Sequence, residues 1–166
     1  MRRTASCLIA IFALSEAALA ADELVPAPKG APLLLEVQAD GVQIYTCDPK
    51  DQGFAWAFKA PEANLFDKQN RQIGTHFAGP AWKIGDSIVV GVVAARADAP
   101  ASGALPWLLL KAKSHEGSGT LSTVAFIRRI NTKGGNAPAG GCDAAHKGEQ
   151  ARMRYDALYQ FFGPEK

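Results

Sequence analysis

Short apolar runs separated by polar and turn-forming residues make up most of the chain after Leu33. Phe54, Trp56 and Phe58 recur at a period of two, which predicts a strand with one aromatic face. In Ser87–Ala95 both faces are apolar, so this segment is expected to form a central strand covered on both sides. The pattern predicts many short strands and no long amphipathic helix.

Turn signals divide these runs. Ala39–Gly41 lies between the apolar runs Leu33–Val37 and Val42–Cys47, and its Asp-Gly pair accepts the positive φ of a tight hairpin turn. The polar segment Asp67–Arg71 predicts a second turn, and the Gly/Ser-rich segment His115–Gly119 predicts a third. The strands beside these two turns are expected at Asn64–Phe66, Gln72–Phe77, Trp107–Ala112 and Thr120–Ile130.

Two periodicities coexist in the last apolar segment, Arg152–Phe162. Alternation through Tyr155 and Tyr159 predicts a strand, whereas Leu158 next to Tyr155 also permits a helical turn. The tyrosines favour the strand, because aromatic residues are enriched in sheets. Together, these segments predict a single mostly β domain over residues 33–166, built as an antiparallel β-sandwich or barrel with one disulfide.

The first twenty residues have the three-part pattern of an export signal. Arg2 and Arg3 form a basic start, Cys7–Leu14 is a short apolar core, and Ala18–Ala20 is a small-x-small cleavage pattern. Cleavage is predicted after Ala20, so the protein is expected to be secreted or periplasmic. Residues 21–32 carry three prolines and a glycine, which indicates an extended leader before the domain.

Two cysteines remain once the signal is removed, Cys47 and Cys142. An even count in an exported chain favours a disulfide, and the alternatives are two buried free thiols or a redox pair. Redox cysteines usually stand close together as Cys-x-x-Cys, unlike these two. A bridge enclosing most of the domain contributes on the order of 4–5 kcal/mol in the chain-entropy model.

The mature chain is close to neutral. Removing Arg2, Arg3 and Glu16 from 18 basic and 16 acidic residues leaves 16 and 15. No basic stripe is visible, so neither nucleic acid nor an anionic membrane surface is an expected partner. The longest uncharged apolar stretch, Ile88–Ala95, is too short to cross a bilayer, and no membrane span is expected in the mature chain.

Four longer blocks are familiar in combination: Gln43–Cys47 (QIYTC), Gly74–Trp82 (GTHFAGPAW), Pro106–Leu110 (PWLLL) and Asn131–Pro138 (NTKGGNAP). In this order they resemble an uncharacterised family of secreted bacterial and fungal proteins that share a domain of unknown function. The resemblance spans roughly residues 43–162. It implies export and the pairing of Cys47 with Cys142, and it brings no activity with it.

His76 is the titratable side chain that stands out, at the end of a predicted strand and just before a turn. A histidine there can act as a base, a metal ligand or part of a sugar site. The alternative is a histidine whose ring nitrogens bond the backbone and hold the turn. His115 and His146 lie in separate predicted loops, and such scattered histidines lack zinc-ligand spacing. No metal, cofactor or catalytic residue is therefore assigned.

Trp82 is the candidate for an exposed aromatic ring, because it lies between a Gly-Pro turn and a lysine. An exposed ring suits glycan binding. Trp56 and Trp107 lie inside apolar runs and are expected in the core.

Basic side chains complete the candidate ligand site. Arg128 and Arg129 fall on opposite faces of one strand, so one is expected to face solvent and the other to find a partner. Lys133 lies in a glycine-rich segment whose backbone N–H groups can bind an anion, although Gly134-Gly135 also suits a tight turn of positive φ. The candidate ligand-site residues are His76, Trp82, Arg128 and Lys133.

Packing and turn residues outnumber convergent polar groups in this chain. The pattern therefore favours a non-catalytic binding or structural module, whose partner is an unknown ligand, a glycan or a protein. The alternative is a small secreted enzyme or metal-binding protein centred on His76.

Overall fold

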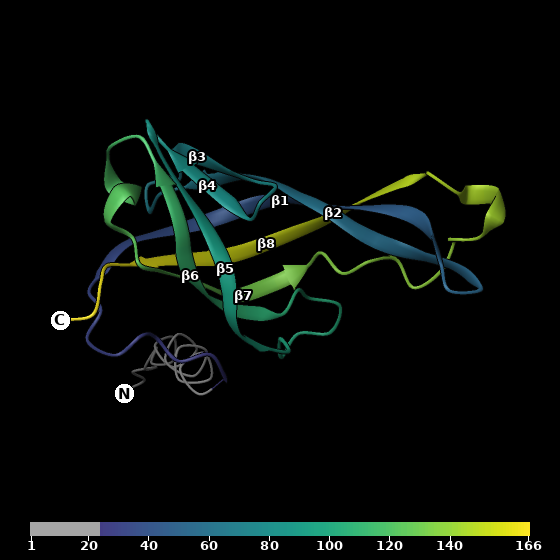
Figure 1. The fold of residues 1–166 in the computed structure, drawn as a ribbon, viewed down its shortest axis with the longest axis horizontal. Coiled ribbons are helices and arrows are strands. Elements are labelled where there is room, and N and C mark those ends of the chain that lie inside the picture. The colour runs from purple at the N-terminus through teal and green to yellow at the C-terminus, as the bar shows by residue number, and fades with distance from the viewer. Residues whose placement is uncertain (1–23) are drawn as a thin grey trace, which may run out of the picture.

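The computed structural model describes residues 24–166 as one closed antiparallel barrel (Figure 1). Each strand pairs with the next one along the chain, and the last strand pairs with the first. The predicted signal segment lies outside the described residues. The strands are β1 (Leu33–Lys50), β2 (Gly53–Phe66), β3 (Gln72–Phe77), β4 (Ala81–Ile84), β5 (Ser87–Ala97), β6 (Trp107–Glu116), β7 (Phe126–Gly134) and β8 (Gln150–Phe162).

The predicted mostly β fold with one disulfide is confirmed, and of the two architectures it is the barrel that forms. The turn at Asp67–Arg71 is present between β2 and β3. The C-terminal segment is the strand β8, as its alternating tyrosines predicted. The predicted strand Thr120–Ile130 is divided: residues Thr120–Thr123 form the 3₁₀ helix η1, and β7 begins at Phe126.

The predicted hairpin turn at Ala39–Gly41 is wrong, because β1 runs unbroken for 18 residues. Gly41 is needed for a different reason. A Cβ atom on Gly41 would lie 2.2 Å from the carbonyl oxygen of Glu62 and 2.4 Å from Ala63 on the neighbouring strand. The glycine therefore allows β1 and β2 to approach closely, in extended backbone that contains no turn.

The expectation for Ser87–Ala95 holds for its first half. Ser87, Val89 and Gly91 of β5 are buried, whereas Val92 and Val93 are each 51% exposed. The second half of β5 extends beyond the packed side chains of the barrel interior to an open rim. Its apolar residues are therefore exposed there.

One end of the barrel is packed shut. At this end lie the connections β2–β3, β4–β5 and β6–β7, and η1 folds over it (left in Figure 1). Leu121 of η1 is fully buried, and its N–H donates to Oγ of Ser87 at 3.2 Å. The buried side chains that fill this end include Val37, Leu65, Val89, Leu121, Val124, Ile127 and Phe161.

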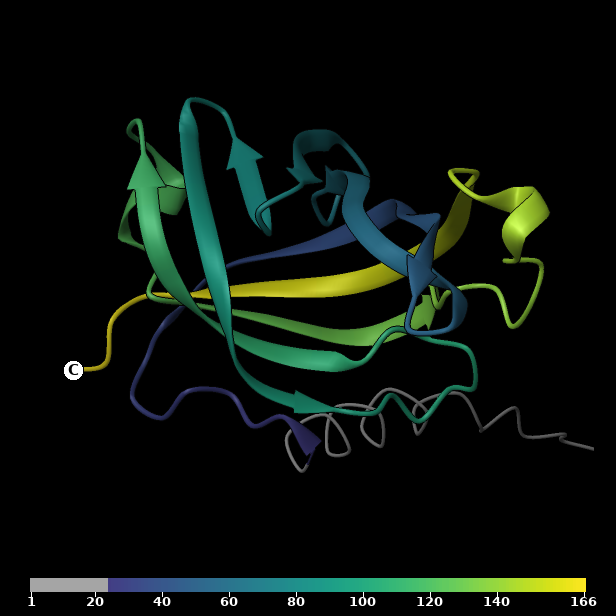
Figure 2. The ribbon, with the colours of Figure 1, turned by 45° about the vertical axis from the view of Figure 1, so that its right-hand side comes forward.

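The described part of the leader, residues 24–32, runs along the outer wall of the barrel (Figure 2). Val25 is fully buried against Trp107 and Ile130, in a cluster separate from the interior core. The Nε atom of Arg128 donates to the Val25 carbonyl at 2.6 Å. This segment is thus an outer layer of the barrel wall. Within residues 24–166, no helix has the length and hydropathy that a membrane span requires.

Candidate ligand-binding cavity

The other end of the barrel holds a cavity of about 640 Å³. It lies between the connections β3–β4, β5–β6 and β7–β8, which contribute Pro80, Leu105 and Asn136 to its lining. Ligand sites for small molecules usually measure about 300–1,000 Å³. The cavity is therefore of a size to hold a small organic molecule.

The walls of the cavity between its base and its rim are largely apolar. Pro61, Leu108 and Leu110 line it from β2 and β6, and Phe58 and Val93 line it near the rim. The two rim side chains are about half exposed, at 53% for Phe58 and 51% for Val93. Solvent therefore reaches the cavity past exposed apolar groups, which is an arrangement typical of a binding mouth.

A cluster of aromatic rings forms the cavity base. His76 on β3 is directly opposite Trp82 on β4, and the two rings stack at 4.5 Å with an interplanar angle of 10°. Tyr159 of β8 meets both rings edge-on, with centroid distances of 5.2 Å to His76 and 5.4 Å to Trp82. Cross-strand pairing therefore fixes a rigid cluster of aromatic rings that lines the cavity.

His76 is held in its neutral form. Its Nδ1 lies 2.8 Å from the carbonyl oxygen of Ala81, so this nitrogen carries the proton and donates it. Burial is the main cause that lowers the pKa of His76 to about 3; the bond to Ala81 opposes this effect, and the charge of Arg129 adds to it. The Nε2 atom is consequently a lone-pair acceptor at neutral pH.

Several buried polar atoms around the cavity make no hydrogen bond of good geometry within residues 24–166. They include Nε2 of Gln43, Nε1 of Trp82 and the hydroxyl of Tyr159, all on side chains that line the cavity. The Tyr155 hydroxyl also lacks a bond of good geometry, although it interacts with both Gln43 and Tyr159. Burial, and then the nearby Tyr159, raises the pKa of Tyr155. Gln43, Tyr155 and Tyr159 therefore form a buried polar cluster behind the cavity surface, shielded from solvent.

Arg129 brings a positive charge into this lining. Its Nε and Nη2 atoms donate to the carbonyl oxygen of Pro106, at 3.1 and 2.9 Å. These two bonds hold the guanidinium in a fixed orientation against the β5–β6 connection, which contains Pro106. Lys59 and Arg96 also line the cavity, and Lys59 pairs with Asp48 at 2.5 Å.

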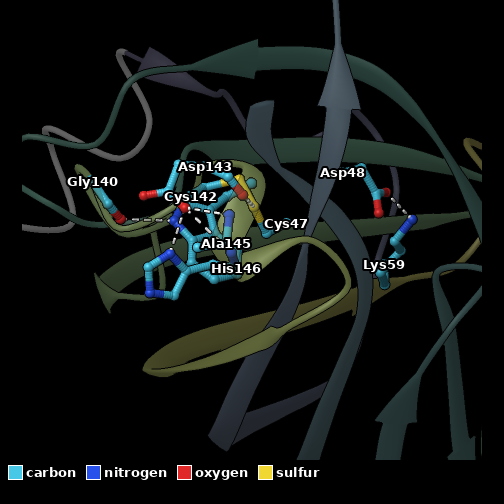
Figure 3. The surroundings of a disulfide bond; sticks show 9 residues. Cys47, Asp48, Lys59, Gly140, Cys142, Asp143, Ala145 and His146 are labelled. Carbon is cyan, nitrogen blue, oxygen red and sulfur yellow. Dashed lines mark hydrogen bonds and ion pairs between the residues drawn. A yellow bond between two sulfur atoms is a disulfide. The ribbon is translucent and has the colours of Figure 1, made fainter. Parts of the chain in front are cut away.

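Covalent and hydrogen bonds hold the rim of the open end. The disulfide Cys47–Cys142 ties β1 to the β7–β8 connection, and the predicted pairing is confirmed (Figure 3). The indole of Trp56 donates to the Gly140 carbonyl at 2.8 Å, and the Tyr45 hydroxyl donates to the Gly135 carbonyl at 2.7 Å. The long β7–β8 connection is therefore fastened to the β1–β2 hairpin at several points.

The structure brings together two of the four candidate site residues. His76 and Trp82 stack on each other and line the cavity. The expectation that Trp82 has an exposed ring is wrong: its side chain is 1% exposed, because alternation along β4 turns it inward and Lys83 outward. Trp107 is buried, as expected, whereas Trp56 is half-buried.

Arg128 and Lys133 lie elsewhere. Arg128 is buried in the outer wall, where its Nη1 donates to Oε1 of Gln160 at 3.1 Å. Lys133 is exposed on β7 and does not line the cavity. The neighbouring Gly134 and Gly135 have positive φ values of 63° and 91°, as the turn interpretation of that segment required.

The residues that sequence reasoning did not select are Gln43, Arg129 and Tyr159. Alternation placed Arg128 and Arg129 on opposite faces, but it does not say which face is inside. A closed barrel answers that question for every strand at once, and Arg129 is the inward arginine.

The three histidines are spread over the fold. Nε2 of His115 is 2.7 Å from the carbonyl oxygen of Val124, and Nδ1 of His146 is 2.7 Å from Oδ1 of Asp143. Within residues 24–166, no group of three or more His, Cys, Asp or Glu side chains is placed to hold a metal ion.

Fold and cavity together define a class of protein, a single up-and-down β-barrel with a ligand-sized cavity at one end. A family model described as Protein of unknown function (DUF3455) matches residues 27–163, and the chain belongs to this family. Comparisons with curated proteins and with solved structures found no match.

Each of the four sequence blocks that suggested a family supplies part of the cavity wall. The first supplies Gln43 and Tyr45, and the second supplies His76 and Trp82 with their turn. The third supplies Leu108 and Leu110, and the fourth supplies Asn136, again all from the lining.

Proposed function

We propose that this chain is an exported protein that binds a small molecule inside its barrel and performs no chemistry on it. The observation that carries the proposal is the cavity of about 640 Å³, with its apolar walls and the aromatic and cationic side chains that line it. The walls of an open apolar cavity lose packing contacts, so a bound molecule that fills the cavity is the simplest reason for its presence.

Export is supported by the pattern of the first twenty residues and by the disulfide. Arg2, Arg3 and the small-x-small pattern Ala18–Ala20 are typical of a cleaved signal. Disulfides form and persist in oxidising compartments, and Cys47–Cys142 is one.

The alternative of an enzyme or metal protein centred on His76 is less well supported. One ring nitrogen is committed to the backbone at Ala81, and a pKa of about 3 makes the ring a weak base at neutral pH. Its contacts favour a role in holding the β3–β4 turn and the aromatic base.

The test uses a neutral apolar probe, 2-naphthalenemethanol, with the oxidised protein. We expect saturable one-to-one binding by isothermal titration calorimetry. The thermal midpoint should rise by a few degrees at probe concentrations well above Kd, because a ligand that binds the native state alone at a hundred times Kd adds about 2.7 kcal/mol.

Two matched variants locate the binding. Val93→Trp places a large ring at the rim of the cavity, whereas Val92→Trp places the same ring on the neighbouring, equally exposed residue that does not line it. Val93→Trp should weaken binding by about tenfold or more through obstruction, and Val92→Trp should leave it unchanged. Absence of binding to the unmodified protein, or equal effects of the two variants, contradicts the proposal.

A further inference from the structure

We propose that the cavity selects organic anions, binding an apolar body with a single anionic group that Arg129 engages at the cavity base. This inference rests on the proposed function and names the class of ligand. The charges of the cavity lining and the available donors of Arg129 support it.

The charges that line the cavity are all of one sign. Arg129, Arg96 and Lys59 are cationic, and none of the lining residues, all of which lie within residues 24–166, is an Asp or Glu. Lys59 is paired with Asp48, but for Arg96 and Arg129 the described residues provide no carboxylate partner. A cavity with apolar walls focuses such charge, because the low dielectric weakens screening.

Arg129 keeps most of its donors available. A guanidinium has five N–H groups, and two atoms of Arg129 donate to the Pro106 carbonyl. The remaining N–H groups have no acceptor among the described residues. A carboxylate can accept two hydrogen bonds from one guanidinium. Because the Arg129 side chain is already held in place, little of its conformational entropy is lost when that bond forms.

Uncharged side chains surround these cations at the inner end of the cavity. Gln43, Trp82 and Tyr159 line the cavity there, and their buried nitrogen and hydroxyl atoms are shielded from solvent. They bring no negative charge that could neutralise Arg129. The positive charge of Arg129 is therefore left for an anionic group of the ligand.

The distribution of these groups also orients the ligand. Arg129 is directly opposite Tyr159 in the pairing of β7 with β8, and both side chains line the cavity, so Arg129 lies beside the aromatic base. Phe58 and Val93 form the apolar rim. In the bound ligand the anionic group therefore points toward the aromatic base, and the apolar body lies between the apolar walls near the rim.

The test compares three molecules with the same naphthalene body: 2-naphthoate, 2-naphthalenemethanol and 2-naphthylmethylammonium. Calorimetry at neutral pH and low salt should give naphthoate the smallest Kd, lower than that of the alcohol by about tenfold to a hundredfold. The ammonium compound should bind more weakly than the alcohol, because it meets like charge and donors. This comparison needs no substitution, so it does not depend on a variant that folds.

Variants then assign the preference to Arg129. Arg129→Gln should bring naphthoate and the alcohol to nearly equal Kd values, whereas Arg129→Lys should keep part of the preference because the charge remains. Arg154→Gln is the control: its side chain is 80% exposed, pairs with Asp40 and lies outside the cavity lining, and its removal should leave the preference unchanged. Circular dichroism and thermal unfolding confirm that each variant is folded.

The outcomes separate the two proposals. If the alcohol binds as tightly as naphthoate, or more tightly, the anion inference is overturned and the binding function stands. If naphthoate is preferred equally by the unmodified protein and Arg129→Gln, Arg129 is not the anchor and the inference as stated is overturned. If none of the three compounds binds, both proposals fall.

Discussion

The two ends of this barrel are built from the same eight strands and differ in what fills them. At the closed end, leucine, isoleucine, valine and phenylalanine side chains pack beneath η1, and Leu121 and Phe161 are fully buried. At the open end the inward positions carry Gln43, His76 and Arg129 instead. The closed end is therefore filled with apolar side chains, and the open end holds polar and charged inward side chains beside its buried aromatic rings.

This contrast suggests a division between stability and function along one axis. A packed core has no room for a ligand, and an open cavity lacks the packing contacts that stabilise a fold. Substitutions at the closed end should change the free energy of unfolding, and substitutions at the open end should change ligand binding.

The largest expected change in the free energy of unfolding is an exception to this division between the two ends, because it comes from the disulfide at the open rim. Replacing both cysteines, Cys47→Ser with Cys142→Ser, should lower the free energy of unfolding by about 4–5 kcal/mol, because the bridge closes a long loop in the unfolded chain. Guanidinium unfolding of the oxidised protein and the double variant measures the difference. The variant should show no further loss under reducing conditions, and equal stability of the two proteins would contradict the prediction.

The second prediction compares matched truncations at the two ends. Leu65→Ala at the closed end should cost about 3–5 kcal/mol, since it empties a fully buried site. Leu108→Ala in the cavity wall should cost clearly less, because Leu108 is half-buried and already borders open space. Urea unfolding gives both values. Similar losses at the two positions would mean that the open end is as tightly packed as the closed one.

The third prediction concerns pH. The pKa of His76 is about 3 in the folded protein against an ordinary 6.5, so the unfolded chain binds the extra proton first. The associated stability is fully present above pH 6.5 and is lost as pH falls toward 3. Between about pH 6.5 and 4.5 this amounts to about 2–3 kcal/mol.

Unfolding at these two pH values should show a smaller pH-dependent loss in His76→Gln than in the unmodified protein. His146→Gln is the matched control, because His146 is on the surface and its pKa is raised by its bond to Asp143. An unchanged acid dependence in His76→Gln would show that His76 is charged or accessible in the folded state.

The smallest expected effect sharpens the comparison most directly. Gln43→Met keeps the volume of the side chain and removes a buried amide whose nitrogen makes no bond of good geometry, although it lies against the Tyr155 hydroxyl. The protein should therefore be no less stable, and at most about 1 kcal/mol more stable. The same change should weaken naphthoate binding. Gln38→Met, on the exposed side of β1, is the control for both measurements. A less stable Gln43→Met variant would mean that the amide is well paired in the unliganded protein.

The mostly β class of the fold was predictable, because apolar and polar residues alternate with a period of two along the strands. Alternation in β8 correctly predicted a strand, and the two cysteines correctly predicted the disulfide. The choice between sandwich and barrel was not predictable, since inward and outward positions alternate in the same way in both. That choice depends on the pairing of β1 with β8, which no local pattern records.

Local signals misled where one residue type serves two purposes. The Asp40-Gly41 pair has the composition of a turn, but Gly41 is required by the close approach of Ala63. Trp82 follows a Gly-Pro turn, which favoured exposure, yet it points into the barrel. The cavity itself was only partly visible in the sequence, because Gln43 and Arg129 join His76 through strand pairing that spans the whole chain.

The position of the disulfide has a consequence for how the barrel forms. All neighbouring strands are also neighbours in sequence, except that β1 must find β8 across nearly the entire chain. Cys47 lies in β1, and Cys142 precedes β8 by little more than η2, although the two cysteines are 95 residues apart. Once the bridge exists, the one distant pairing becomes a local hairpin-like event with a small loop-closure entropy. Oxidation before folding therefore turns a chain of high contact order into one whose every strand pair is close along the covalent path.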